Sequence, residues 1–188
     1  MIQLMYRYDL ETMFFFIIPW VIYRFLVWLF TKRFSLQTEL LKGMFFFSLV
    51  FIYMLTLFPF PIYSHDYLEG IPLSQRVNLI PFASIYGSLT HFCYMVPIRN
   101  IVGNIILFIP LGFLIPLRFK MFKLWKTAIF GFLVSLLVET IQLLFTGRSF
   151  DVDDLILNTF GAIAGFTCFN LLFLSLTKVK QRKTSLGT

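Results

Sequence analysis

The residues of this chain that could do chemistry gather in one stretch near the C-terminal end, between two strongly apolar runs. The stretch runs from Glu139 to Gly165, and its ionisable side chains are Glu139, Arg148, Asp151, Asp153 and Asp154. A carboxylate in an apolar region is costly unless it is paired, neutral or hydrated, so such groups often mark a functional site. Carboxylates of this kind could hold a divalent metal or act as a general acid or base, and the arginine could bind an anion.

Polar residues recur at helical spacing along three of the apolar segments, near one end of each. The three stripes are Asn100 and Asn104; Ser135, Glu139, Gln142 and Thr146; and Asp151, Asp154, Asn158, Gly161 and Gly165. Steps of three and four residues place side chains on one face of a helix. The sequence therefore predicts a polar pocket between these three helices. The glycines of the last stripe form a face of small residues that lets another helix approach closely.

The same residues also fit a structural interpretation, in which they fasten the helices together. Arg148 or a nearby amide could satisfy Glu139, while Asp153 and Asp154 could stabilise the N-terminus of the last helix through its macrodipole. Acid spacing alone is a weak signal for a metal, so we expect no resident cofactor. A divalent metal held by Glu139, Asp151 and Asp154 stays open as an alternative.

The composition places the chain among membrane proteins. Hydrophobic residues make up 59% of the 188 residues, against about half in soluble domains. A helix needs about 20 apolar residues to cross the hydrocarbon core, and five segments approach this length. These segments are Thr12–Phe30, Leu40–Phe58, Ile101–Leu117, Leu124–Phe145 and Leu155–Leu176. We predict an all-α integral membrane protein, residues 1–188 forming a single membrane domain with a bundle of about five transmembrane helices.

Basic residues lie at the ends of the apolar runs, which argues against nucleic acid as the reason for the formal charge of +7. Lysine and arginine favour the cytoplasmic side, and they enrich the first and third connections and the tail at 177–188. We therefore expect the N-terminus outside, the C-terminus inside and the polar pocket facing outward. The long connection at 59–99 should lie outside and partly in the interface, with short helices. Arg24 should snorkel toward the cytoplasmic face.

Four motifs occur in order over residues 78–165. They are NLIPF at Asn78–Phe82, RNIVGNIILFIPLGFLIP at Arg99–Pro116, ETIQ at Glu139–Gln142 and GRSFDVDDLILNTFGAIAG at Gly147–Gly165. At these residues the chain resembles the VanZ-like family of bacterial membrane proteins. The resemblance implies a protein of the bacterial cytoplasmic membrane that gives low-level resistance to glycopeptide antibiotics, teicoplanin more than vancomycin. It transfers no catalytic residue.

The polar stripes and the motif positions together give ten candidate ligand-binding residues. They are Asn78, Arg99, Asn100, Asn104, Glu139, Gln142, Arg148, Asp151, Asp154 and Asn158. The first hypothesis is a non-enzymatic envelope protein that binds a lipid-linked or peptidoglycan-related ligand and so reduces glycopeptide action. A phosphate or carboxylate on that ligand would suit Arg99 and Arg148.

The alternative hypothesis is an integral membrane enzyme that modifies a lipid headgroup or a wall precursor. Glu139, Asp151 or Asp154 would then serve as the acid or base. The partners expected under either hypothesis are membrane lipids and a lipid-linked cell-wall precursor or a glycopeptide. The face formed by Gly161 and Gly165 leaves room for a second copy of the chain.

Overall fold

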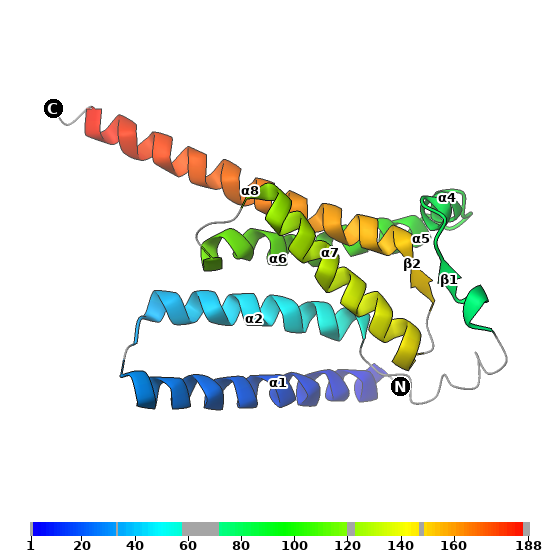
Figure 1. The fold of residues 1–188 in the computed structure, drawn as a ribbon, viewed down its shortest axis with the longest axis horizontal. Coiled ribbons are helices and arrows are strands. Elements are labelled where there is room, and N and C mark those ends of the chain that lie inside the picture. The colour runs from blue at the N-terminus through cyan, green and yellow to red at the C-terminus, as the bar shows by residue number, and fades with distance from the viewer. Residues whose placement is uncertain (1, 33, 58–71, 120–122, 147–148, 186–188) are drawn as a thin grey trace. The chain divides into compact units, whose positions relative to one another are not determined.

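The computed structural model describes residues 2–32, 34–57, 72–119, 123–146 and 149–185. The chain divides into two compact units, Met1–Lys42 and Gly43–Thr188, which are described separately. The first unit contains α1 (Ile2–Thr31) and the start of α2 (Leu36–Thr56). The second unit holds the rest of α2 and every later element (Figure 1).

In the first unit, an ion pair joins α1 to the first turn of α2. The Arg24 guanidinium donates two hydrogen bonds of 2.6 Å to the Glu39 carboxylate, and the Lys42 ammonium donates a third of 2.9 Å. The two side chains of the arginine pair are only 17% and 19% exposed. The charge of Arg24 is thus met by a carboxylate of the next helix. Snorkelling of Arg24 toward the cytoplasmic face stays a prediction.

In the described part of the second unit, the secondary structure is helical apart from one pair of very short strands. After α2 come η1 (Leu73–Gln75), β1 (Val77–Asn78), α4 (Ala83–Leu89), α5 (Met95–Pro97), η2 (Ile98–Val102), α6 (Gly103–Phe119), α7 (Leu124–Ile141), η3 (Gln142–Thr146), β2 (Phe150–Asp151) and α8 (Val152–Ser185). The segments η2 and η3 are π-helical turns that continue into α6 and from α7. The strands pair in parallel, with Asn78 opposite Asp151. Strands of two residues are too short to show the alternating pattern by which a strand is predicted.

Five helical stretches within the described residues are long and apolar enough to cross a membrane, which confirms the predicted fold class. They are Phe14–Thr31, Leu36–Thr56, Met95–Phe119, Leu124–Leu144 and Val152–Thr177. The third is longer than the expected Ile101–Leu117, because α5 and the π-helical η2 extend it toward its N-terminus. The described part of the long connection at 59–99 contains the short helices α4 and α5, as predicted.

Glycines let α6 and α8 lie backbone to backbone. Gly161 and Gly165 of α8 face the backbone carbonyls of Ile105 and Ile109 in α6, and Gly112 of α6 faces α8 in return. A Cβ atom at any of these glycines would overlap backbone atoms of the other helix. The close approach predicted from GAIAG is therefore made within the chain. A homo-oligomer through Gly161 and Gly165 would have to displace α6.

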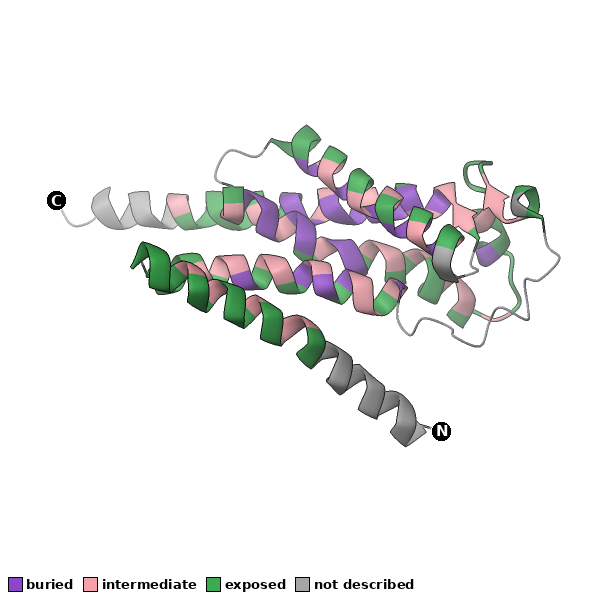
Figure 2. Ribbon diagram, turned by 60° about the horizontal axis from the view of Figure 1, so that its bottom comes forward, coloured by how far each residue is buried: buried purple, intermediate pink, exposed green. Residues whose placement is uncertain are grey.

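An apolar core fills the space between α2, α6, α7 and α8 of the second unit. Its buried members are Ile52, Leu57, Leu107, Phe108, Leu111, Ile115, Val138 and Ala162. In Figure 2 the buried residues of these helices concentrate where the helices meet. Their outward sides carry exposed apolar side chains such as Phe132 and Leu171. This is the surface that a bundle needs in hydrocarbon, where no polar partner is available.

The substitution Gly161→Ala should destabilise the protein by about 1–3 kcal/mol, because the added methyl group forces α6 away from α8. Gly103→Ala in α6 is the matched control, since a Cβ there has no neighbour within 4 Å, and it should be neutral or slightly stabilising. Thermal unfolding of both purified variants in detergent measures the difference. Equal unfolding temperatures for the two variants would contradict the close packing.

Candidate functional site

A cavity of about 690 Å³ lies among the helices of the second unit. Its polar lining residues are Thr56, Ser84, Ser88, Arg99, Asn100, Asn104, Glu139, Gln142, Asp151, Asp153, Asp154 and Asn158. Two of the four carboxylates come from the start of α8 and the others from β2 and α7, whereas α2 contributes the apolar side chains of Phe51 and Leu55. The cavity thus combines a polar lining with an apolar one, and it draws on segments far apart in the sequence.

Asp153 is the most deeply buried carboxylate of the cavity wall, with 1% of its surface exposed. Its oxygens accept backbone N–H bonds from Phe82 at 2.5 Å, Ser84 at 2.8 Å and Ile85 at 3.0 Å. The first N–H groups of a helix have no acceptor within that helix. A carboxylate beside them also interacts favourably with the positive end of the helix dipole. Phe82 has a φ of 67°, a left-handed conformation that is costly for a bulky residue. Asp153 therefore holds a strained turn in place.

Asp151 ties β2 to the same turn. Its side chain accepts hydrogen bonds from the amide of Asn78, at 3.1 Å, and from the hydroxyl of Ser84. It also accepts the backbone N–H of Asp153 at 2.9 Å. The pairing of β1 with β2 places Asn78 opposite Asp151, which brings the two side chains together. The NLIPF and DVDD segments therefore build one polar wall.

The two asparagines of the RNIVGN segment bond to different elements. Asn104 of α6 donates to the Asp154 carboxylate of α8 at 2.5 Å. Asn100 of η2 donates to the Ser88 hydroxyl of α4 at 3.2 Å. Arg99, next to Asn100, is exposed and also lines the cavity. This segment therefore bridges α4 and α8 and supplies a cation at the exposed part of the site.

Glu139 is buried on α7, with 2% of its surface exposed. It accepts the backbone N–H of Asp151 at 3.1 Å. Arg148, the partner suggested by the sequence, lies outside the described residues. Gln142, nearly one turn further along the chain, donates to the backbone carbonyl of Thr56 at the end of α2, at 2.8 Å. These two bonds fasten α7 to β2 and α2, as the structural interpretation requires.

Asn158 lies one helical turn beyond Asp154 on α8 and is 2% exposed. Its amide donates to the hydroxyl of Ser135 at 2.9 Å, and Ser135 lies one turn before Glu139 on α7. The amide oxygen of Asn158 is buried and has no hydrogen-bond partner among the residues that the structure describes. A buried acceptor left in this way costs about 1–3 kcal/mol. Asn158 lies one turn nearer the middle of α8 than Asp154, and Ser135 lies one turn nearer the middle of α7 than Glu139. The cavity wall thus holds an unused acceptor at this level.

The structure brings most of the predicted residues together. Those that line the cavity are Arg99, Asn100, Asn104, Glu139, Gln142, Asp151, Asp154 and Asn158. Asn78 supports the wall from β1 by its bond to Asp151, and Arg148 lies outside the described residues. Sequence reasoning missed Ser84 and Ser88 of α4. Their spacing of four residues in FASIYGS is a helical signal that could have indicated them.

The carboxylates are distributed over α7, β2 and α8. Among the described residues, no three His, Cys, Asp or Glu side chains are placed so that they could hold a metal ion. The carboxylates of Asp151 and Asp153 instead accept N–H and O–H groups from Asn78, Phe82 and Ser84. A divalent metal at Glu139, Asp151 and Asp154 stays a prediction that no cluster of ligands among the described residues supports.

Apolar spans that surround a cavity lined by carboxylates and amides define a multi-pass membrane protein with a polar site inside its helix bundle. A protein-family model described as VanZ/LLP1 matches residues 45–173, a range that includes every residue of the cavity lining. The chain belongs to this VanZ/LLP1 family, as its four motifs indicated. The matched range leaves out α1 and the first part of α2.

Among curated proteins, the chain is similar to Protein VanZ of Enterococcus faecium. The two are 30% identical over 127 residues, which make up 66% of this chain and 73% of that protein. No solved structure matches the chain. The family is thus established by sequence alone, and the geometry of the cavity comes from this chain.

The substitution Asp153→Asn should loosen the turn before α4, because an amide oxygen accepts the three N–H groups more weakly than a carboxylate does. We expect the amides of Phe82, Ser84 and Ile85 to exchange their hydrogens at least about tenfold faster. Hydrogen exchange followed by mass spectrometry measures this. Thr90→Ala, which removes a hydroxyl at the other end of α4, should leave those rates unchanged. Unaltered exchange in the Asn variant would show that Asp153 does not hold the turn.

Proposed function

We propose that this VanZ-family protein binds a lipid-linked or cell-wall-related ligand in its polar cavity and thereby lowers the susceptibility of the cell to glycopeptide antibiotics such as teicoplanin. The observation that carries the proposal is the cavity of about 690 Å³, which residues of the RNIVGN, ETIQ and DVDD segments line together. Its volume lies within the range of about 300–1,000 Å³ that is usual for ligand pockets.

The composition of the lining favours an amphiphilic ligand. Apolar side chains of α2 and α6, among them Phe51, Leu55 and Ile106, lie along the same cavity as the carboxylates and amides. A hydrocarbon chain is stabilised by the first group and a polar headgroup by the second. Lipid-linked wall precursors and membrane lipids combine these two chemistries in one molecule.

A purely structural role accounts less well for the cavity. Polar residues that only fastened helices together would be expected to pack closed, because protein interiors are as dense as organic crystals. Here the polar residues surround an open volume, and no described residue bonds to the amide oxygen of Asn158. Both features are expected of a wall that is completed by a bound molecule.

Protection from teicoplanin should depend on the cavity and not on the rest of the bundle. In a teicoplanin-sensitive host that expresses the protein, the double variant Glu139→Gln, Asp154→Asn should be as susceptible as cells without the protein. Both changes keep side-chain shape while removing charge from the cavity wall. Minimum inhibitory concentrations, with membrane expression checked in parallel, measure the effect.

Glu39→Gln is the matched control for this experiment. It removes a carboxylate of the first unit that is paired with Arg24 and is not among the residues that line the cavity. Protection should persist in this variant. Full protection by the cavity double variant, at equal expression, would count against the proposed function.

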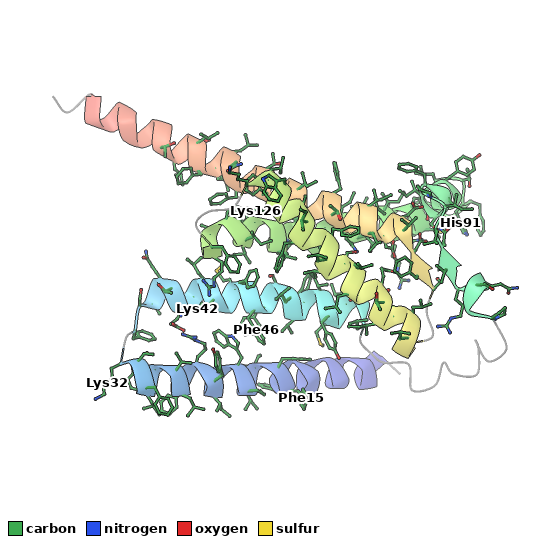
Figure 3. All side chains as sticks on the ribbon, viewed as in Figure 1. Phe15, Lys32, Lys42, Phe46, His91 and Lys126 are labelled. Carbon is green, nitrogen blue, oxygen red and sulfur yellow. The ribbon has the colours of Figure 1, made fainter. Side chains whose placement is uncertain are left out.

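The positive-inside distribution of lysine and arginine supports an outward-facing cavity, with the N-terminus outside and the C-terminus inside. Thr90 and Lys123 flank the stretch Met95–Phe119, so the two residues should lie on opposite sides of the membrane. Figure 3 labels His91, which follows Thr90 beyond the end of α4, and Lys126, which lies close to Lys123 at the start of α7. These two residues lie well apart in the second unit.

Cysteine labelling on whole cells tests this orientation. With Cys93 and Cys168 changed to serine, Thr90→Cys should react with a membrane-impermeant thiol reagent. Lys123→Cys should react only after the membrane has been opened. The reverse pattern would place the cavity on the cytoplasmic side, away from glycopeptides and from the outer-leaflet form of a wall precursor.

The alternative function is a membrane enzyme that modifies a lipid headgroup or wall precursor. The observation that favours it is Glu139, a nearly fully buried carboxylate in the wall of a cavity. A general acid or base needs such a position beside its substrate. Incubation of the purified protein with lipid-linked precursors, with and without divalent metal, separates the two functions, because only the enzyme yields a product.

A further inference from the structure

We propose that the cavity selects its ligand through an ammonium group, held between Glu139, Asp154 and the amide oxygen of Asn158. The inference deepens the proposed function and rests on it for the amphiphilic nature of the ligand. It assigns the cavity a cationic headgroup chemistry, where the sequence had suggested a phosphate or carboxylate bound by arginines.

The charge of the cavity wall is one-sided. Four carboxylates line it, those of Glu139, Asp151, Asp153 and Asp154, and Arg99 is the one cation among the lining residues that the structure describes. Interactions between charges are strong where water is scarce, so this wall attracts a cation and repels a phosphate.

The cavity also offers an acceptor that none of the described residues uses. Within the described part of the chain the oxygen of the Asn158 amide accepts no hydrogen bond, although the side chain is only 2% exposed and its amide nitrogen donates to Ser135. Asn158 follows Asp154 by four residues, and Ser135 precedes Glu139 by four. Residues four apart share one helix face, so the unused acceptor lies one helical turn further into the bundle than the carboxylates of Glu139 and Asp154.

An ammonium group complements this arrangement better than the other ions that the carboxylates could attract. It carries three N–H donors and no acceptor, so it can donate to the amide oxygen and to carboxylates at once. A phosphate would bring acceptors to a wall made of acceptors. A divalent metal needs several ligands around one point, and the described residues contain no such group of His, Cys, Asp or Glu.

Arg99 adds a cation at the exposed part of the cavity. Arg99 lines the cavity from η2 and is exposed, whereas Asn158 is buried between α7 and α8. A ligand with an ammonium near Asn158 can therefore carry an anionic group toward Arg99. Aminated lipids and wall intermediates with a free amine share this chemistry.

Binding of three probes with the same tail tests the proposal. The full-length protein in nanodiscs is titrated with decylammonium, decanol and decyl phosphate, and bound molecules are counted by native mass spectrometry. Decylammonium should bind at least about tenfold more tightly than decyl phosphate, because the carboxylates of the cavity wall attract the positive charge of the first and repel the negative charge of the second. Ethylammonium, which lacks the tail, shows whether a free amine suffices or an amphiphile is required.

Two variants examine the charges and the open acceptor. Glu139→Gln should lower the affinity for decylammonium about tenfold and leave decanol unchanged. Asn158→Asp should raise the affinity for decylammonium, because it adds negative charge and acceptors at the same position. Glu39→Gln, outside the cavity lining, is the control and should bind all three probes as the unaltered protein does.

The outcomes separate this inference from the proposed function. Tighter binding of decyl phosphate, further strengthened by Glu139→Gln, would overturn the ammonium site but keep the cavity as a binding site. Binding of no probe would also overturn the ammonium site, and the teicoplanin assay would then decide the proposed function independently. Unchanged selectivity in both Glu139→Gln and Asn158→Asp, with normal thermal unfolding, would show that these residues do not select the ligand.

Discussion

The contact on which the site depends is the carboxylate of Asp153 with three backbone N–H groups at the start of α4. α4 is too short to be stable alone, and Phe82 before it has a left-handed backbone conformation. A buried carboxylate can hold such a turn because charged acceptors make strong hydrogen bonds. Once the turn is fixed, Ser84 reaches Asp151 and Ser88 reaches Asn100. The cavity wall is thus built around a structural charge.

A second constraint is the distance between α6 and α8. Because glycines bring the two backbones together, the short side chain of Asn104 reaches Asp154 across the interface. Larger residues at Gly161 or Gly165 would separate the helices, and an asparagine could not span the gap. Polar and small residues therefore act together, the small ones setting the spacing at which the polar ones meet.

Much of this arrangement could be predicted from the sequence, and the rest could not for identifiable reasons. Long apolar runs predict the five spans. Helical spacing places Glu139 on the polar face of α7, and Asp154 and Asn158 together on the polar face of α8. The role of Asp153 escaped prediction because its partners are backbone groups 68 to 71 residues earlier in the chain, which no local pattern reports. The pairing of β1 with β2 escaped for a similar reason, since it joins two-residue strands whose paired residues are 73 apart in the sequence.

The length of α8 has a consequence for how the cavity could be controlled. The helix runs unbroken for 34 residues, from beside the cavity to Ser185. At 1.5 Å per residue it is about 51 Å long, against about 30 Å of hydrocarbon. It therefore extends well past one membrane face as a single rod. A pull or a rotation applied to that far end would shift Asp153, Asp154 and Asn158 together, which makes α8 a lever between the two sides of the membrane.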